Sequence, residues 1–222
     1  MRTINKTSIL STHYKAWEAE LEERGADHPI YRSSNFRFYL DIVMNLFHCQ
    51  QGLCAYTEMR LCQPEAFAPE HWKDGRYAAE APDFFGHLEH FDTALKERKA
   101  WLWSNLFMVD SDVNTKVKGK QVADAILKPD SNSYDAFRLL EYDMQTHFFI
   151  ANADLPEDER QRITVMLDTL GINFGPVKDR RRKCLTRQLK MIEFGLAAWD
   201  ESPDEFVTAF AMCKREQNVF SP

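Results

Sequence analysis

The sequence lacks any apolar run close to the roughly 20 residues that a membrane-spanning helix needs. Its first residues, MRTINKTSILSTHYKAW, also lack the apolar region of a signal peptide. Net positive charge is missing too, because 28 Lys and Arg residues against 34 Asp and Glu residues give a formal charge of −6. A protein that coats nucleic acid by bulk electrostatics is therefore excluded, since phosphates are bound through Lys and Arg. We expect a cytoplasmic protein whose contacts with nucleic acid are local.

The sequence also lacks the paired cysteines of a disulfide framework. Its five cysteines are odd in number and irregularly spaced, so we expect free thiols in a reducing compartment. Internal repeats, low-complexity tracts and domain linkers are absent as well. Because 44% of the 222 residues are hydrophobic and 13% aromatic, the chain can build a sizeable core. We expect one domain over residues 1–222.

What the chain does contain is one stretch rich in chemically useful side chains, GHLEHFDTALKERKAWLWSNLFMVDSDVNTKVKGK, from residue 86 to 120. It holds the pair Glu89-His90, then Asn105 in WSNL, then Asn114 in VNTKVKGK. Hydrolysis of a phosphodiester needs a base for water, a divalent cation for the developing charge, and groups that fix both in place. These four side chains could supply all three.

The segments EHF, WSNL and VNTKVKG, in this order and at these distances, resemble the HNH endonucleases. The resemblance extends to GLCAYTE upstream and to ILKPD and LGINFGPVKDRRRK downstream, and covers roughly residues 36 to 189. It is most like the HNH subunit of Septu-type and retron-associated antiphage defence systems, which is encoded beside an ABC-type or SMC-type ATPase. The resemblance implies an α+β fold, mostly helical, with a ββα-metal core wrapped by N- and C-terminal helices.

The resemblance also implies a role for each of the four residues. His90 would take the proton from the attacking water, and Asn105 would orient the loop that carries it. Glu89 and Asn114 would hold Mg²⁺ or Mn²⁺ against the phosphate. The expected function is a metal-dependent endonuclease, the effector subunit of a bacterial defence complex. The alternative is an inactive subunit that binds nucleic acid or acts as an adapter in such a complex.

Positive charge is clustered at two places in this acidic chain. Lys116, Lys118 and Lys120 follow Asn114 and are candidates for phosphate contacts, and the second cluster is KDRRRK, residues 178–183. Charge runs are most often solvated faces of helices. For the first cluster, the nearby Glu89, His90, Asn105 and Asn114 give a phosphate-binding surface about the same weight as a solvated helix face.

A structural zinc site is not expected, although relatives in the resembled family carry one. Their two C-x-x-C pairs place four thiolates around the metal. The corresponding positions here are Cys54, Thr57, Asp110 and Val113, and one thiolate cannot make a tetrahedral site. We expect packing or hydrogen bonds to hold this knuckle instead.

A competing interpretation starts from His87-Leu88-Glu89, because H-x-E opens the signature of zinc deaminases. That signature requires P-C-x-x-C downstream, whereas Cys184 and Cys213 are far apart and unpaired. We therefore prefer to read His87 as a histidine at the end of a strand, on the rim of the site.

The expected elements fall into three parts: a helical part over 1–50, the HNH core over 51–128, and a hairpin with C-terminal helices over 129–222. Helices are predicted around residues 14–21 and 38–47, and the proline-rich segment 63–85 reads as a loop. Strands are predicted at 87–91 and through 105–109, where Trp101 and Trp103 alternate with smaller residues into the second strand, and a helix should start near Asp110. Alternation places Glu89 and His90 on opposite faces, so both can face one site only if the strand bends or ends there.

In the last part, Phe137 and Leu139 are expected in the first strand of a second hairpin, which returns at 147–150. Helices should follow from 157 to 170 and then through LGINFGPVKDRRRK, with an apolar face that extends to Leu196 and Trp199. A capping box at residues 202–205 predicts the start of the last helix. The terminal helices, with large apolar residues such as Trp17, Trp199, Phe206 and Phe210, are the expected docking surface for the ATPase, unless these aromatics are core.

Overall fold

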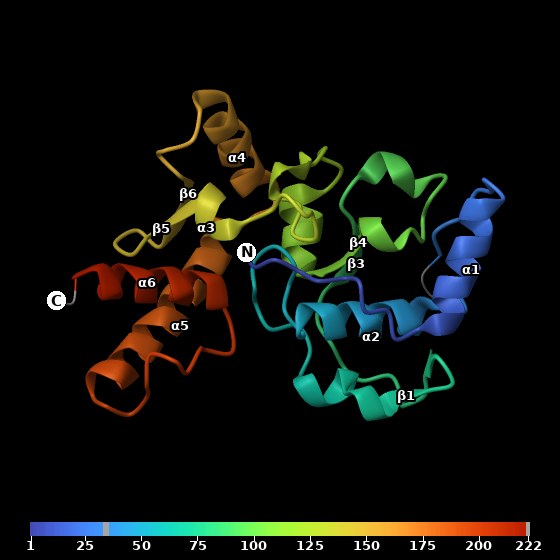
Figure 1. The fold of residues 1–222 in the computed structure, drawn as a ribbon, viewed down its shortest axis with the longest axis horizontal. Helices are drawn as coiled ribbons and strands as arrows, with labels where there is room; N and C mark the ends of the chain where they lie inside the picture. Colours follow the sequence, from blue (N-terminus) through green and yellow to red (C-terminus); the bar gives the residue numbers. More distant parts are fainter. Residues whose placement is uncertain (33–35, 221–222) are drawn as a thin grey trace.

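The computed structural model describes residues 1–32 and 36–220, which form a mixed α+β fold that is mostly helical, with 45% helix and 10% strand (Figure 1). Among these residues no helix has the length and apolar character to cross a bilayer. The α-helices are α1 (Thr12–Glu23), α2 (Tyr39–Gln50), α3 (Ala136–Leu139), α4 (Glu157–Thr169), α5 (Gly175–Glu193) and α6 (Val207–Phe220). The strands pair into two-stranded antiparallel sheets: β1 (Trp72–Lys73) with β2 (Arg76–Tyr77), β3 (His87–His90) with β4 (Leu106–Val109), and β5 (Leu140–Asp143) with β6 (Phe148–Ala151).

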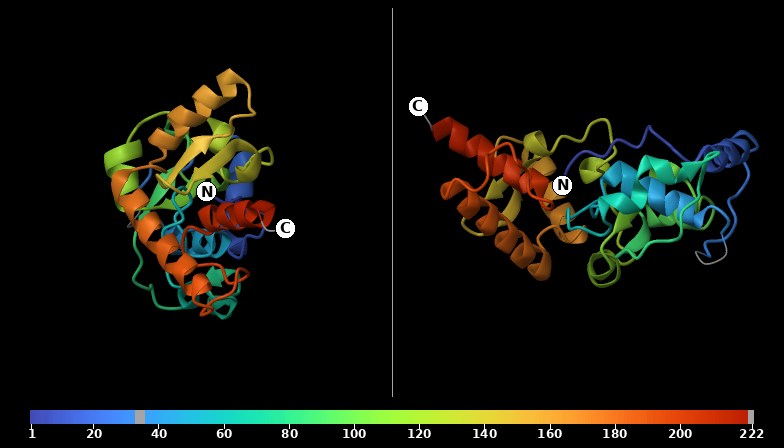
Figure 2. Two further views of the ribbon diagram at one scale, coloured as in Figure 1. Left: turned by 90° about the vertical axis from the view of Figure 1, so that its left-hand side faces the viewer. Right: turned by 90° about the horizontal axis from the view of Figure 1, so that it is seen from below.

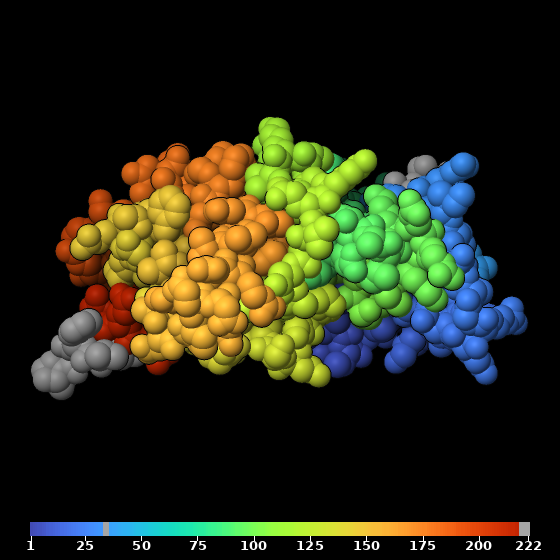
Figure 3. Space-filling model, turned by 90° about the horizontal axis from the view of Figure 1, so that it is seen from above, coloured from blue at the N-terminus to red at the C-terminus, as the bar shows by residue number. Residues whose placement is uncertain are grey.

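The molecule is elongated, and its N-terminus lies near the middle (Figure 1). One half holds α1, α2 and the hairpin of β3 and β4, and the other holds α3 to α6 with the hairpin of β5 and β6 (Figures 1 and 2). The space-filling view shows the segment around residues 120–135 lying between the two halves (Figure 3). Buried apolar side chains form a cluster that includes residues of both halves, from Tyr14 to Phe210.

The hairpin of β3 and β4 was predicted from sequence, and β3 ends one residue earlier than predicted. Trp103, which was expected to lead into the second strand, lies instead in a 3₁₀ turn (Trp103–Asn105) before β4. His87 pairs with Val109 and His90 with Leu106. Gly86 precedes β3 with φ +96°, and a Cβ there would lie 2.5 Å from the Val109 carbonyl oxygen, so only glycine fits this close approach. Every residue of β4 is buried, and α2 packs against it. This hairpin is therefore a core element rather than a surface ribbon.

A helical segment follows β4 directly, as predicted. Asp110 Oδ1 accepts hydrogen bonds from the backbone N–H groups of Asp112 (3.0 Å) and Val113 (3.1 Å), which caps the start of the segment. Residues Val113–Lys118 are π-helical, and the N–H of Gly119 donates to the Asn114 carbonyl oxygen at 2.9 Å. The chain thus builds a β-hairpin and a helix in succession.

Three predictions for the other segments were wrong in detail. The segment 63–85 is not entirely a loop, because it contains 3₁₀ turns (Pro64–Phe67 and Pro69–His71) and the short hairpin of β1 and β2. Phe137 and Leu139 lie in α3, because Asp135 accepts from the N–H of Phe137 and starts a helical turn there. Leu196 and Trp199 lie beyond α5, which ends at Glu193, and Leu196 is 72% exposed.

The last helix starts at Val207, later than the predicted capping box, and its cap comes from a distant residue. The buried carboxylate of Glu58 accepts from the N–H of Thr208 at 2.9 Å and from the Thr208 hydroxyl at 2.5 Å. The Met1 ammonium lies 3.4 Å from the same carboxylate. Glu58 therefore joins the two halves of the molecule.

The aromatics that were predicted to form a docking surface on the terminal helices are mainly core. Phe206 and Phe210 are each 1% exposed, and Trp199 stacks on Phe210 with ring centroids 5.7 Å apart. Trp17 packs against Phe36 at 5.1 Å. The apolar face of a helix normally turns towards the core, and these side chains follow that rule.

Candidate active site

The candidate site lies where β3 ends. The strand stops at His90, and the N–H of the following Phe91 donates to the carbonyl oxygen of Asn105 at 2.9 Å. The condition for Glu89 and His90 to share a site, that the strand ends there, is met. Both side chains are buried, with exposed fractions of 6% for Glu89 and 2% for His90.

The imidazole of His90 is held in one tautomer. Its Nε2 lies 2.7 Å from the carbonyl oxygen of Ala100, and a carbonyl can only accept, so Nε2 carries the proton. Nδ1 then keeps its lone pair. Burial, followed by the charges of Lys96 and Lys118, lowers the pKa of His90 to about 4, while the Ala100 hydrogen bond acts in the opposite direction. The ring is neutral at pH 7, as a general base must be.

Asn105 closes the loop between β3 and β4. Its Oδ1 accepts from the N–H of Asp92 at 2.8 Å, and its Nδ2 donates to the carbonyl oxygen of Asp92 at 2.9 Å. The amide thus fixes the backbone two residues after His90. This is the contact that the expected loop-orienting role requires, made by a side chain that is 3% exposed.

Lys118 does not point into solvent, and its prediction as a surface phosphate contact is wrong. Its side chain is 0% exposed, and its Nζ lies 2.5 Å from Glu89 Oε1 and 3.2 Å from the carbonyl oxygen of His90. Burial raises the pKa of Glu89, and the Lys118 ammonium acts in the opposite direction. The ammonium therefore lies against the carboxylate that was expected to bind a divalent cation.

The other residues predicted near this helix differ in their surroundings. Asn114 lies in the first turn of Val113–Lys118, as expected, and is half-buried. Lys116 is exposed and pairs with Asp112 at 2.8 Å, and Lys120 is exposed as well. Lys116 and Lys120 thus remain accessible to a phosphate.

As arranged here, these residues do not fit a divalent cation. Magnesium is bound through one or two free carboxylates completed by waters or phosphate oxygens, whereas the Glu89 carboxylate already holds the Lys118 ammonium. Over residues 1–32 and 36–220 no group of three or more His, Cys, Asp or Glu side chains could hold a metal ion. The geometry therefore assigns no metal-dependent step to Glu89 or Asn114.

The knuckle that carries cysteines in the resembled family is held here by hydrogen bonds. The N–H of Asp110 lies 3.3 Å from Cys54 Sγ, and Gln50 Nε2 donates to the carbonyl oxygens of Leu53 (2.7 Å) and Met108 (2.8 Å). Gln50 Oε1 in turn accepts from the N–H of Met108 at 2.9 Å. One buried amide thus ties the turn at Leu53 to β4.

Two residues near His90 were not indicated by the sequence. The Tyr31 ring meets the imidazole edge-on with centroids 5.0 Å apart, and the ammonium of the exposed Lys96 lies 4.6 Å from the Tyr31 ring centroid. Lys96 is a cation beside His90 that solvent can reach. No motif signals Tyr31, because it lies in the N-terminal part, far from the hairpin in sequence.

Lys6 is a third residue that the sequence did not indicate. It is 8% exposed, and its Nζ donates to the carbonyl oxygen of Leu106 at 2.9 Å and also to that of Trp103. Asp130 lies 3.2 Å from the same ammonium, which is 4.2 Å from the centroid of the Phe107 ring. Lys6 thus fixes the end of the loop that Asn105 closes.

His87, which prompted the deaminase interpretation, is exposed at the start of β3. Cys184 and Cys213, the cysteines considered with it, are free thiols, and burial raises their pKa to about 11 and about 12. Thiolate ligands are favoured by a lowered pKa, so these two residues do not resemble zinc ligands.

Comparison of the sequence with models of protein families finds no match, and comparison with curated proteins finds no similar sequence.

Proposed function

We propose that this chain is a nuclease of the HNH type, which hydrolyses phosphodiester bonds of DNA or RNA. The observation that carries the proposal is the pair of hydrogen bonds between the Asn105 amide and the backbone of Asp92, which fixes the loop beside a neutral, oriented His90. A hairpin with a histidine at the end of its first strand, followed by a helix, also agrees with the ββα core that the resemblance implies.

In this proposal His90 Nδ1 takes the proton from an attacking water, because Nε2 is already committed to Ala100. Lys96, Lys116 and Lys120 attract the phosphate backbone. Magnesium or manganese remains the proposed cofactor, but no step is assigned to it, because Lys118 holds Glu89 in the present arrangement. Cation dependence is therefore a result to be measured.

The test is cleavage of supercoiled plasmid, single-stranded DNA and total tRNA, each with magnesium, with manganese and with chelator. His90→Gln is the informative variant, because a glutamine amide can still donate to Ala100 and limits the damage to the buried site. His13→Ala, which changes an exposed histidine of α1, is the matched control. Cleavage that survives in His90→Gln would refute the role of the base.

An inactive adapter is the second candidate, and the buried ion pair of Lys118 and Glu89 favours it. If the chain has exchanged a metal for an ammonium, it cleaves none of the three substrates with either cation. Binding to nucleic acid would persist in that case. The same assay, read beside a binding measurement, separates the two candidates.

We also propose that a partner, an ATPase subunit of the ABC or SMC type, opens the site. The Tyr31 ring lies against the imidazole of His90, which is 2% exposed, and in this proposal the partner moves Tyr31 to admit a phosphate. Tyr31→Ala should then raise cleavage by the isolated chain, whereas Tyr39→Ala, which changes another partly buried tyrosine, should not. Co-expression with the neighbouring gene, followed by size-exclusion chromatography, tests the complex itself. A chain that stays monomeric and cuts equally well alone excludes this gating.

A further inference from the structure

Helix α5 concentrates the positive charge of an acidic chain. It carries seven of the 28 Lys and Arg residues but only two acidic residues, Asp179 and Glu193, whereas the whole chain has a formal charge of −6. Such a polarised distribution is the electrostatic footprint of a surface that meets a polyanion.

The structure separates the cations of α5 by their surroundings. Arg181 is buried and its Nη1 donates to the carbonyl oxygen of Ile172 at 2.9 Å, and Arg180 Nε donates to Glu205 at 2.8 Å. Besides Arg180, the exposed cations of the helix are Arg182, Lys183, Arg187 and Lys190. Asp179 lies 3.7 Å from Arg182, and since both side chains are 56% exposed this pair contributes little.

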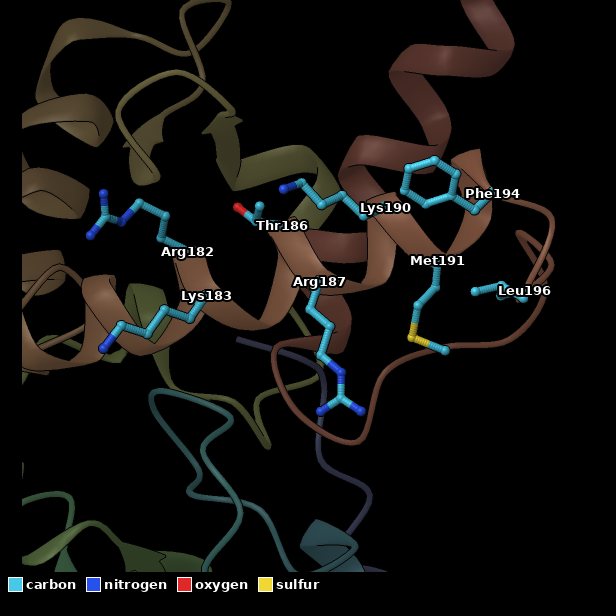
Figure 4. A pocket seen from close by; sticks show the side chains of 8 residues that line it. All are labelled: Arg182, Lys183, Thr186, Arg187, Lys190, Met191, Phe194 and Leu196. Carbon is cyan, nitrogen blue, oxygen red and sulfur yellow. The ribbon is translucent and has the colours of Figure 1, made fainter.

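These exposed cations form two adjacent rows (Figure 4). Arg182, Thr186 and Lys190 follow one edge of the helix at intervals of four residues, and Lys183, Arg187 and Met191 follow the other (Figure 4). With Phe194 and Leu196 these residues line a groove of about 560 Å³ that has no acidic side chain in its lining. Each row spans about 12 Å of helix, enough for several phosphates.

The groove ends on exposed apolar side chains. Phe194 is 71% exposed and Leu196 is 72% exposed, and both lie just beyond the C-terminal end of α5 (Figure 4). Surfaces that bind single strands combine a cationic track with an aromatic ring on which a base stacks. Lys183 and Arg187 also line a second pocket, where Asp204 and Glu205 lie beside Arg60 and Arg180, so its lining is mixed in charge, unlike that of the groove.

We propose that this groove binds single-stranded nucleic acid, with phosphates on the four exposed cations and a base stacked on Phe194. A membrane surface fits less well, because a lipid-binding helix exposes its apolar face, whereas the apolar face of α5 is buried through Val177 and Leu185. This inference rests on the proposed nuclease function and adds that its substrate is single-stranded nucleic acid. Arg180 lines one pocket with Asp110 and Ser111, so α5 begins beside the helix of the candidate active site.

The experiment is fluorescence anisotropy of a labelled oligothymidine in chelator, so that no cleavage occurs. With four phosphate contacts, the slope of log K against log salt should be about −2.8, a loss of about 50-fold between about 50 mM and about 200 mM salt. The double variant Arg187→Gln with Lys190→Gln should halve this slope to about −1.4. The control, Lys15→Gln with Lys73→Gln, removes the same charge from exposed sites outside α5 and should keep the full slope.

Phe194→Ala should weaken oligothymidine binding about fivefold or more while leaving the salt slope unchanged, because stacking involves no counterion. A labelled duplex should bind Phe194→Ala and the unaltered chain equally. The inference is overturned if oligothymidine does not bind, if both double variants lose affinity alike, or if only vesicles of phosphatidylserine bind. Binding as expected without any cleavage contradicts the proposed nuclease but leaves this inference standing.

Discussion

Replacing Lys118 by methionine should destabilise the protein strongly. The side chains of Lys118 and Glu89 are 0% and 8% exposed, with 2.5 Å between Nζ and Oε1, so the variant leaves a desolvated carboxylate without its counter-charge. Removing one partner of a buried ion pair costs about 3–5 kcal/mol. For a chain of this size that loss lowers the Tm by about 6–20 °C.

Urea unfolding at pH 7 measures this cost, with the m value showing whether the transition stays comparable between variants. The double variant Lys118→Met with Glu89→Gln removes both charges and should recover all but about 1–2 kcal/mol, since a neutral amide costs less to bury. A single variant that loses less than about 1 kcal/mol would show that the ion pair is solvated, and the reasoning about Lys118 would be wrong.

The same variant tests whether the ammonium stands where a cation would bind. With Lys118 gone, magnesium at about 100 times its Kd should restore about 2.7 kcal/mol by mass action on the folded state. The unaltered protein should show no such effect, because its Glu89 is held. Equal stabilisation of both proteins by magnesium would place the cation elsewhere.

Three further measurements test Asn105, Lys6 and the absence of a zinc site. Asn105→Ala removes both hydrogen bonds to Asp92 and should cost about 2–3 kcal/mol by urea unfolding together with any nuclease activity, and no loss of stability would remove the basis of the loop argument. Burial lowers the pKa of Lys6 from 10.5 to about 8, so between these values the unfolded state binds more protons. The free energy of unfolding should therefore rise with pH over that window by about 3 kcal/mol, and Lys6→Met should lack this rise. Elemental analysis should find well under one zinc per chain, because Cys54 is the one cysteine at the four knuckle positions, and stoichiometric zinc would contradict this.

The hairpin could be predicted from sequence because its signals are local. Alternation and aromatic content define both strands, and Asp110 marks the helix that follows. The place of Lys118 could not be predicted in this way. The turn around Asn114 is widened into a π-helix, so the side chains after it do not follow the α-helical positions assumed from sequence. An ion pair with Glu89, 29 residues earlier in the chain, produces no periodic pattern in the sequence.

The C-terminal part shows why periodicity alone misleads. Leu196 continues the apolar spacing of α5, but Gly195 has φ +67° and the helix ends at Glu193, so Leu196 turns out to solvent. The glycine was the available signal, since glycine commonly follows the last turn of a helix. Likewise, the capping box near residue 203 predicted too early a start for the last helix. The carboxylate that caps this helix at Thr208 belongs to Glu58, which is too distant in sequence for a local pattern to indicate.

The contact of Glu58 with Thr208 also sets the timing of assembly on the ribosome. The two residues are 150 positions apart, and ribosomal synthesis at roughly 5–20 residues per second leaves Glu58 without this partner for roughly 8–30 s. During that interval the Glu58 carboxylate has the Met1 ammonium beside it but lacks the two hydrogen bonds from Thr208. The hairpin of β3 and β4 is therefore synthesised before α6, and α6, the last helix to be made, supplies the hydrogen bonds that join the two halves at Glu58.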